Sequence, residues 1–260
     1  MIKFELARAI CPAYCRTLDV SPPPMTTATA RIPTPAPAFD IAKARFNMIE
    51  QQIRPWDVLD QDVLDLLQVL KREDFVPPEH RLLAFSDLEI PLSGPGGSAA
   101  AGARMWTPKL EARVLQELAP RHHERALEIG TGSGYFAALL AHCCKQVTTV
   151  EIVSTLKAFA ERNLRTAGIA NVTVIEGDGA AGFGREPFDI IVLSGSTPML
   201  PPALVDQLRP GGRMFAVVGD APAMTARLLT RQAGGCSAVT LFETVLAPLT
   251  NAAQPERFRF

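Results

Sequence analysis

The chain has 260 residues, of which 47% are hydrophobic and 20% are charged, and its formal net charge is −1. This length can bury the core of one α/β domain with an extension. The balanced charge gives no basic surplus that would favour nucleic acid or an anionic membrane as a partner, and no apolar run is long enough to cross a bilayer.

Cysteine and histidine are too few and too scattered to indicate a stabilising cross-link or a metal centre. The five cysteines show no repeated spacing, which argues against a disulfide framework and favours reduced thiols in the cytoplasm. His122 and His123 lie in a polar segment without a second group of ligands nearby. We therefore predict a cytoplasmic protein with no metal site.

Residues 1–38 form a proline-rich tail in which prolines alternate with threonine and alanine. Such a segment cannot form a helix or a central strand, and it lacks the apolar periodicity needed to pack on a domain. It is predicted to be disordered and dispensable for folding and ligand binding.

Residues 39–108 are predicted to form an N-terminal helical cap followed by a substrate loop. Asp40 and Asp60 each precede an apolar pattern of helical period, so each is expected to begin a helix. The inward residues are expected to be Ala42, Phe46, Ile49 and Ile53 in the first helix, and Val63, Leu66, Leu67 and Leu70 in the second.

The predicted substrate loop covers residues 93–107 and is rich in glycine and alanine. These residues bury little side-chain area that could offset the entropy lost on ordering. The loop is therefore expected to be mobile without ligand and to close over a cleft. It ends at Thr107, which with Pro108 has the pattern of a helix start.

From residue 109 to residue 250 apolar strands alternate with helices, which indicates a mostly parallel sheet. We predict a Rossmann-like α/β fold with seven strands, helices on both faces and the N-terminal helical extension. Residues 251–260 are assigned to a C-terminal tail. Five strands are predicted at 126–129, 147–151, 172–176, 188–193 and 212–218, two more at about 225–249, and a turn at 209–212.

A glycine-rich turn joins the first of these strands to a helix, an arrangement that binds nucleotides in open α/β sheets. Glycines stand at 130, 132 and 134, so the third comes one residue too early for the G-x-G-x-x-G fingerprint. Tyr135 takes the last fingerprint position, which disfavours the alternative of a nicotinamide-dependent oxidoreductase. Glu128, two residues before the turn, opposes a pyrophosphate but suits a cationic ligand.

This E-x-G-x-G-x-G pattern resembles motif I of the class I S-adenosylmethionine-dependent methyltransferases. The resemblance implies S-adenosyl-L-methionine as cofactor, with the turn wrapped around its methionine part. Together with Glu128, the cofactor contacts then expected are Gly130, Thr131, Gly132, Ser133, Gly134 and Tyr135.

Three further strand ends carry candidate site residues. Glu151, followed by Ile152, ends the second strand, where an acid can accept hydrogen bonds from both ribose hydroxyls of a nucleoside. Asp178 follows the third strand between Gly177 and Gly179, placed to accept from an adenine amino group. Taken alone, the first could be an exposed carboxylate and the second an ordinary turn.

Ser194 follows the fourth strand, whose carboxyl end faces the reacting centre in sheets of this kind. It is a candidate for both cofactor binding and catalysis, the alternative being a polar loop residue.

Residues from about 46 to 249 resemble the protein-L-isoaspartate O-methyltransferase family, which methylates the abnormal carboxylate of isoaspartyl residues. The resemblance implies a protein or peptide substrate with isoaspartyl residues, or a small carboxylate, and no nucleic acid or membrane partner. The matching segments are Met48–Ile53, Phe75–Pro77, Ala84–Asp87, Leu127–Tyr135, Gly177–Gly179, Pro187–Asp189 and Gln207–Gly212.

The chain departs from the family in the loop before the first long strand. The family carries G-Q-T-I-S-Q-P there, with the serine close to the methyl-transfer centre, whereas this chain has Trp106 at that position. Trp106 could wall the site or contact the sulfonium, or it could be a core aromatic. Arg104 could pair with an acceptor carboxylate, and Thr107 is a further expected cofactor contact. A cofactor-binding pseudoenzyme and a methyltransferase with another acceptor are the alternatives.

Overall fold

The computed structural model describes residues 39–92 and 102–255. The predicted disorder of residues 1–38, most of the predicted substrate loop and the end of the C-terminal tail therefore lie outside the described residues.

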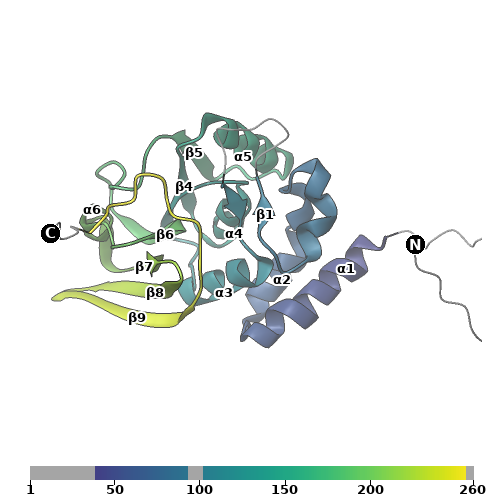
Figure 1. The fold of residues 1–260 in the computed structure, drawn as a ribbon, viewed down its shortest axis with the longest axis horizontal. Coiled ribbons are helices and arrows are strands. Elements are labelled where there is room, and N and C mark those ends of the chain that lie inside the picture. Colours follow the sequence, from purple (N-terminus) through teal and green to yellow (C-terminus); the bar gives the residue numbers. More distant parts are fainter. Residues whose placement is uncertain (1–38, 93–101, 256–260) are drawn as a thin grey trace, which may run out of the picture. The chain divides into compact units, whose positions relative to one another are not determined.

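One seven-stranded sheet organises the chain, in the order β5-β4-β3-β6-β7-β8-β9 (Figure 1). Strands β3 to β7 pair in parallel, whereas β8 and β9 form an antiparallel hairpin at one edge. The strand order changes direction between β3 and β6, the point where open α/β sheets bind ligands. The strands are β3 (Arg125–Ile129), β4 (Gln146–Glu151), β5 (Val172–Glu176), β6 (Phe188–Thr197), β7 (Leu208–Asp220), β8 (Ala223–Gln232) and β9 (Gly235–Glu243).

The predicted mostly parallel, seven-stranded sheet is confirmed, but two predicted boundaries were wrong. Strand β6 continues past Ser194 to Thr197, because its last residues still pair with β7. The turn predicted at 209–212 lies inside β7 as a bulge, where the pairing moves from Leu208 directly to Arg213. Bulges of this kind bend a strand without ending it.

Side chains alternate between the two faces of the sheet and so form two apolar clusters. The larger cluster contains Ala126, Val147 and Ile190, together with residues of α3 (Pro108–Leu118), α4 (Tyr135–Cys143) and α5 (Ser154–Thr166). The smaller cluster contains Leu127 and Ile191 and is covered by α6 (Pro202–Asp206) and neighbouring segments.

Helix α3 has the predicted start: Pro108 is its first residue, and the Thr107 hydroxyl accepts from the amide of Leu110 at 3.4 Å. The apolar face of this helix is buried and consists of Leu110, Val114, Leu115 and Leu118.

The N-terminal cap packs into the larger cluster, and Figure 1 shows its helices beside α3. It comprises α1 (Ile41–Met48), a π turn (Ile49–Ile53), a 3₁₀ turn (Arg54–Trp56), α2 (Gln61–Val69), two further 3₁₀ turns (Arg72–Asp74 and Pro78–Phe85) and the short strands β1 (Ile90–Pro91) and β2 (Arg104–Met105).

Both predicted N-caps are present in the cap, since Asp40 and Asp60 accept backbone hydrogen bonds at the starts of α1 and α2. The inward face of α1 was partly wrong, because Phe46 is 54% exposed whereas Met48 and Ile49 are buried. The π turn that follows α1 shifts the helical phase, so a face assigned from a continuous 3.6-residue repeat does not hold.

None of the helices among residues 39–92 and 102–255 is long and apolar enough to cross a membrane.

Candidate active site

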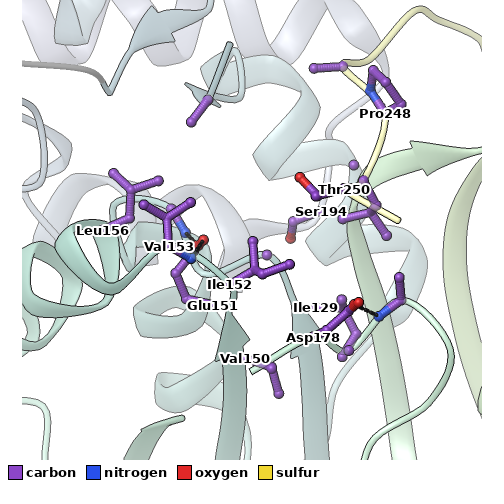
Figure 2. Close-up of a pocket in the computed structure, with 18 of the residues that line it drawn as sticks. Ile129, Val150, Glu151, Ile152, Val153, Leu156, Asp178, Ser194, Pro248 and Thr250 are labelled. Atoms are coloured by element: carbon purple, nitrogen blue, oxygen red, sulfur yellow. Dashed lines mark hydrogen bonds between the residues drawn. The ribbon is translucent and has the colours of Figure 1, made fainter. Parts of the chain in front are cut away.

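A cavity of about 320 Å³ opens at the carboxyl ends of β3, β4, β5 and β6. Figure 2 shows Val153 and Leu156 on one side of it and Pro248 and Thr250 on the other. Most of the predicted cofactor residues line it, namely Gly130, Gly132, Glu151, Ile152, Gly177, Asp178, Gly179 and Ser194.

The glycine turn after β3 leaves its backbone open to the cavity. Gly132 has a φ of +53°, and a Cβ there would lie 3.0 Å from the Cδ1 atom of Leu92. A side chain at this position would be strained and would crowd the cavity wall. The turn therefore offers backbone groups, not side chains, to a ligand.

Glu151 is held rigidly at the end of β4. Its side chain is almost buried, and its two carboxylate oxygens accept the backbone amides of Gly132 at 2.9 Å and Val153 at 3.1 Å. Each oxygen keeps a lone pair, so the carboxylate can accept two more hydrogen bonds from a ligand diol.

Asp178 lies after β5 on the neighbouring wall, where Figure 2 shows its bond to the amide of Ala180, 3.0 Å long. The floor beside it must be glycine, because a Cβ at Gly179 would lie 2.5 Å from the Cδ1 atom of Ile129. The backbone of Gly179 therefore packs directly against the Ile129 side chain, and both residues line the cavity.

Glu128 lies beneath the turn and lacks a cationic partner among its hydrogen bonds. It is 1% exposed and accepts hydroxyl hydrogen bonds from Thr149 at 2.7 Å and Ser194 at 3.0 Å. Burial raises the pKa of Glu128 to about 8, and the two hydroxyls only partly oppose this effect. At neutral pH the carboxyl group of Glu128 is therefore mostly in its protonated, neutral form.

A second, smaller cavity of about 40 Å³ adjoins the first. It shares Arg104, Gly130 and Ser194 with the larger cavity and extends inward to Glu128 and Trp106. The two cavities meet at the glycine turn. A group bound in the smaller cavity would therefore lie next to a ligand bound in the larger one.

Trp106 forms one wall of the smaller cavity and is only 6% exposed. Its indole N–H donates to the Ser194 carbonyl at 3.0 Å, and its ring packs against Phe136 and Phe215 at centroid distances of 5.2 and 5.9 Å. The residue is thus both a site wall and a core aromatic. Met105 is buried as well. Both residues belong to the predicted substrate loop of residues 93–107, but they are packed in the larger apolar cluster.

Arg72, which the sequence analysis did not single out, holds the other side of Trp106. This side chain is 1% exposed and donates to the Trp106 carbonyl at 2.6 Å, the Ala84 carbonyl at 2.8 Å and the Glu111 carboxylate at 2.9 Å. No local sequence pattern signals these contacts, because the partners come from distant parts of the chain.

Arg104, the first residue of β2, lines both cavities. Its side chain is 48% exposed, and its nearest carboxylate oxygen, on Glu89, is 3.9 Å away. The guanidinium is therefore available to a further carboxylate.

Six predicted cofactor residues do not line the larger cavity, and three of these line neither cavity. Thr107 caps α3, Gly134 packs against Ala160 of α5, and the Tyr135 hydroxyl donates to the Leu70 carbonyl in the core at 3.4 Å. Thr131 and Ser133 line only the smaller cavity. The segment 247–250 lines the larger cavity and was not predicted, because its sequence has no signature of a ligand site.

Among the described residues, no group of three or more His, Cys, Asp or Glu side chains could hold a metal ion.

An open parallel sheet with a cavity at its switch point, a glycine turn, and acids ending β4 and following β5 define a class I S-adenosylmethionine-dependent methyltransferase. Residues 43–254 match the family model described as protein-L-isoaspartate(D-aspartate) O-methyltransferase. The chain belongs to this protein-L-isoaspartate O-methyltransferase family.

Curated relatives and solved structures agree with this assignment. The protein-L-isoaspartate O-methyltransferase of Methanoculleus marisnigri is 35% identical over 80% of this chain and 91% of its own. That of Anaeromyxobacter dehalogenans is 39% identical over 75% and 91%. A Plasmodium falciparum structure, described as a putative member in complex with S-adenosyl-L-homocysteine, has a TM-score of 0.67 at 19% identity, over 82% of this chain and 99% of its own. At that identity the match supports the fold.

Proposed function

We propose that this protein transfers the methyl group of S-adenosyl-L-methionine to the side-chain carboxylate of isoaspartyl residues in proteins or peptides. The observation that carries the acceptor assignment is Arg104, a residue with a half-exposed side chain that lines both the larger cavity and the smaller cavity beside it. We place the reaction in the cytoplasm, where it would begin the repair of damaged aspartyl and asparaginyl sites.

The residues around the larger cavity fit the cofactor. Glu151 has free lone pairs for a ribose diol, and Asp178 stands beside a floor too close-packed for side chains at Gly179. The cofactor supplies a methyl group on a positively charged sulfur. The protein's task is to bind and orient it with its methyl group toward the acceptor.

A carboxylate acceptor needs no general base, because it is already a nucleophile when ionised. Catalysis then depends on alignment and on excluding water. Arg104 can hold the acceptor by two parallel hydrogen bonds, a geometry that lysine does not reproduce.

Trp106 supplies the apolar side of this site in place of the serine that the family carries. It is fixed through both its indole N–H and its carbonyl, so its ring can exclude water without a large movement. Glu128 differs from the apolar Trp106, because an ionised carboxylate there would repel the negatively charged acceptor. Its raised pKa keeps it mostly neutral near pH 7.

The proposal is tested by incubating the protein with methyl-labelled S-adenosyl-L-methionine and two peptides that differ only in an isoaspartyl or an ordinary aspartyl residue. We expect base-labile methyl ester on the isoaspartyl peptide alone. No transfer to either peptide by protein that binds S-adenosyl-L-homocysteine would identify a pseudoenzyme or a methyltransferase with another acceptor.

A further inference from the structure

The segment after β9 returns across the mouth of the larger cavity and forms a strap, defined here as residues 246–252. Ser196 of β6 holds it at three points: its amide donates to the Ala247 carbonyl at 2.9 Å, its carbonyl accepts from the Leu249 amide at 2.9 Å, and its hydroxyl donates to the Leu246 carbonyl at 3.0 Å. The strap is thus fixed to the end of β6, where Figure 2 shows Pro248 and Thr250 above Ser194.

The far end of the strap reaches the opposite wall. Asn251 has a φ of +61°, in the left-handed region that asparagine tolerates better than most residues, and the Ala252 amide closes the turn on the Leu249 carbonyl at 3.2 Å. This turn directs the Asn251 side chain at Asp178, and its amide N–H donates to the Oδ2 atom at 2.8 Å.

The two oxygens of Asp178 are therefore fixed by two different donors. The Ala180 amide donates to Oδ1 at 3.0 Å, and the Asn251 side-chain amide donates to Oδ2 at 2.8 Å. The plane of the carboxylate therefore cannot rotate freely. Asp178 lines the cavity, whereas Asn251 stands behind it and is absent from the lining. Each oxygen keeps a lone pair, and a ligand that meets this carboxylate must offer a hydrogen-bond donor.

We propose that Asn251 is a positioning residue that orients Asp178 to select a 6-amino purine over a 6-oxo purine in the cofactor. This inference rests on the proposed function, in which Asp178 faces the base. An adenine amino group donates to a fixed acceptor, whereas a 6-oxo group would place lone pair against lone pair. Loss of Asn251 would free the carboxylate to turn away and so weaken the choice between the two bases.

Calorimetric titration of the full chain with S-adenosyl-L-homocysteine and with S-inosyl-L-homocysteine tests the inference without any turnover. Asn251→Gly removes the amide while keeping the left-handed backbone free of strain. We expect it to lower the adenosyl-to-inosyl affinity ratio about tenfold, the effect of losing one hydrogen bond to a charged group. Asp57→Gly is the matched control, since Asp57 also has a positive φ (59°) but its carboxylate lies near Arg113 and not near Asp178. It should keep the wild-type ratio.

Exchanging Asn251 and Asp178 tests for a result that would not occur if Asn251 only stabilised the fold. In the double variant Asn251→Asp with Asp178→Asn, the introduced carboxylate can accept from the introduced amide, whose second N–H then faces the cavity as a donor. We expect this variant to prefer the inosyl compound, while Asn251→Asp alone binds both compounds more weakly.

Unchanged ratios in Asn251→Gly and in the double variant would overturn the inference about Asn251 alone. Failure of the folded wild-type protein to bind either compound would overturn the proposed function, and this inference with it.

Discussion

The two walls of the active site are built in different ways. The cofactor wall consists of strand ends and turns, in which Glu151 is held by the amides of Gly132 and Val153 within 19 residues of sequence. The acceptor wall consists of Trp106, held by Arg72 and Ser194 at separations of 34 and 88 residues. The support of Glu151 is therefore local to the sheet, whereas the acceptor site depends on tertiary packing between the cap and the sheet.

The largest expected effect comes from breaking the support of the acceptor wall. Arg72→Leu leaves the buried Glu111 carboxylate without its cation and should destabilise the protein by about 3–5 kcal/mol in urea unfolding. The double variant with Glu111→Leu should recover much of this loss. Arg81→Leu, which breaks the exposed pair with Asp74, is the control and should cost about 0–1 kcal/mol. A single Arg72 variant as stable as this control would contradict the assigned role.

The next effect concerns the cofactor wall. Glu151→Ala should weaken S-adenosyl-L-homocysteine binding about 10- to 100-fold, because hydrogen bonds from the ribose to a charged group are lost. Glu176→Ala is the control. Glu176 lies opposite Glu151 in the strand register, at the end of β5, but it does not line the cavity. Calorimetry should find its affinity unchanged, and equal losses in both variants would refute a specific ribose contact.

The sequence predicts the cofactor wall well because the relevant chemistry is local. A glycine turn between a strand and a helix, and acids at or just after the next two strand ends, converge on one edge of a parallel sheet by topology alone. The strap and Arg72 could not be found in this way. Their partners are set by how distant segments pack. Neither Asn251 nor Arg72 belongs to a sequence motif from which its contacts could be predicted.

Two side chains point in directions that the sequence pattern did not predict. Phe46 was assigned to the core because a continuous helical period was assumed through a π turn. Tyr135 was assigned to the cofactor because it follows the glycines, but its ring packs on Phe75 in the core, with centroids 5.3 Å apart. Position along a motif predicts backbone placement better than it predicts the direction of a side chain.

A smaller effect should separate binding from turnover at the acceptor wall. Arg104→Lys keeps the charge but loses the two-point geometry, so turnover of the isoaspartyl peptide should fall about tenfold. Affinity for S-adenosyl-L-homocysteine should stay at the wild-type value. Normal turnover in this variant would show that Arg104 faces solvent and does not hold the acceptor.

The pKa of Glu128 predicts a modest pH dependence of cofactor binding. Below about pH 8 the group is mostly neutral, and above it the carboxylate ionises and attracts the sulfonium of S-adenosyl-L-methionine. Affinity for this cofactor relative to the thioether product should therefore rise several-fold between pH 6.5 and pH 9. Glu128→Gln should remove the pH dependence, and a dependence that survives this substitution would assign it to another group.

The smallest effect is expected from the N-terminal tail. Deleting residues 1–38 should leave the melting temperature within about 2 °C, since the chain from Asp40 onward forms a compact unit with its own core. A fall of several degrees in a thermal melt would show that the tail contributes to the fold.

The separateness of the two walls is tested most directly by a double-mutant cycle on kcat/KM for the isoaspartyl peptide at limiting cofactor. The cycle comprises the wild type, Glu151→Ala, Arg104→Lys and the double variant. If the walls act independently, the two losses in transition-state free energy should add to within about 0.5 kcal/mol. An interaction energy above about 1 kcal/mol would contradict the account, because it would mean that cofactor and acceptor are held by one coupled set of contacts.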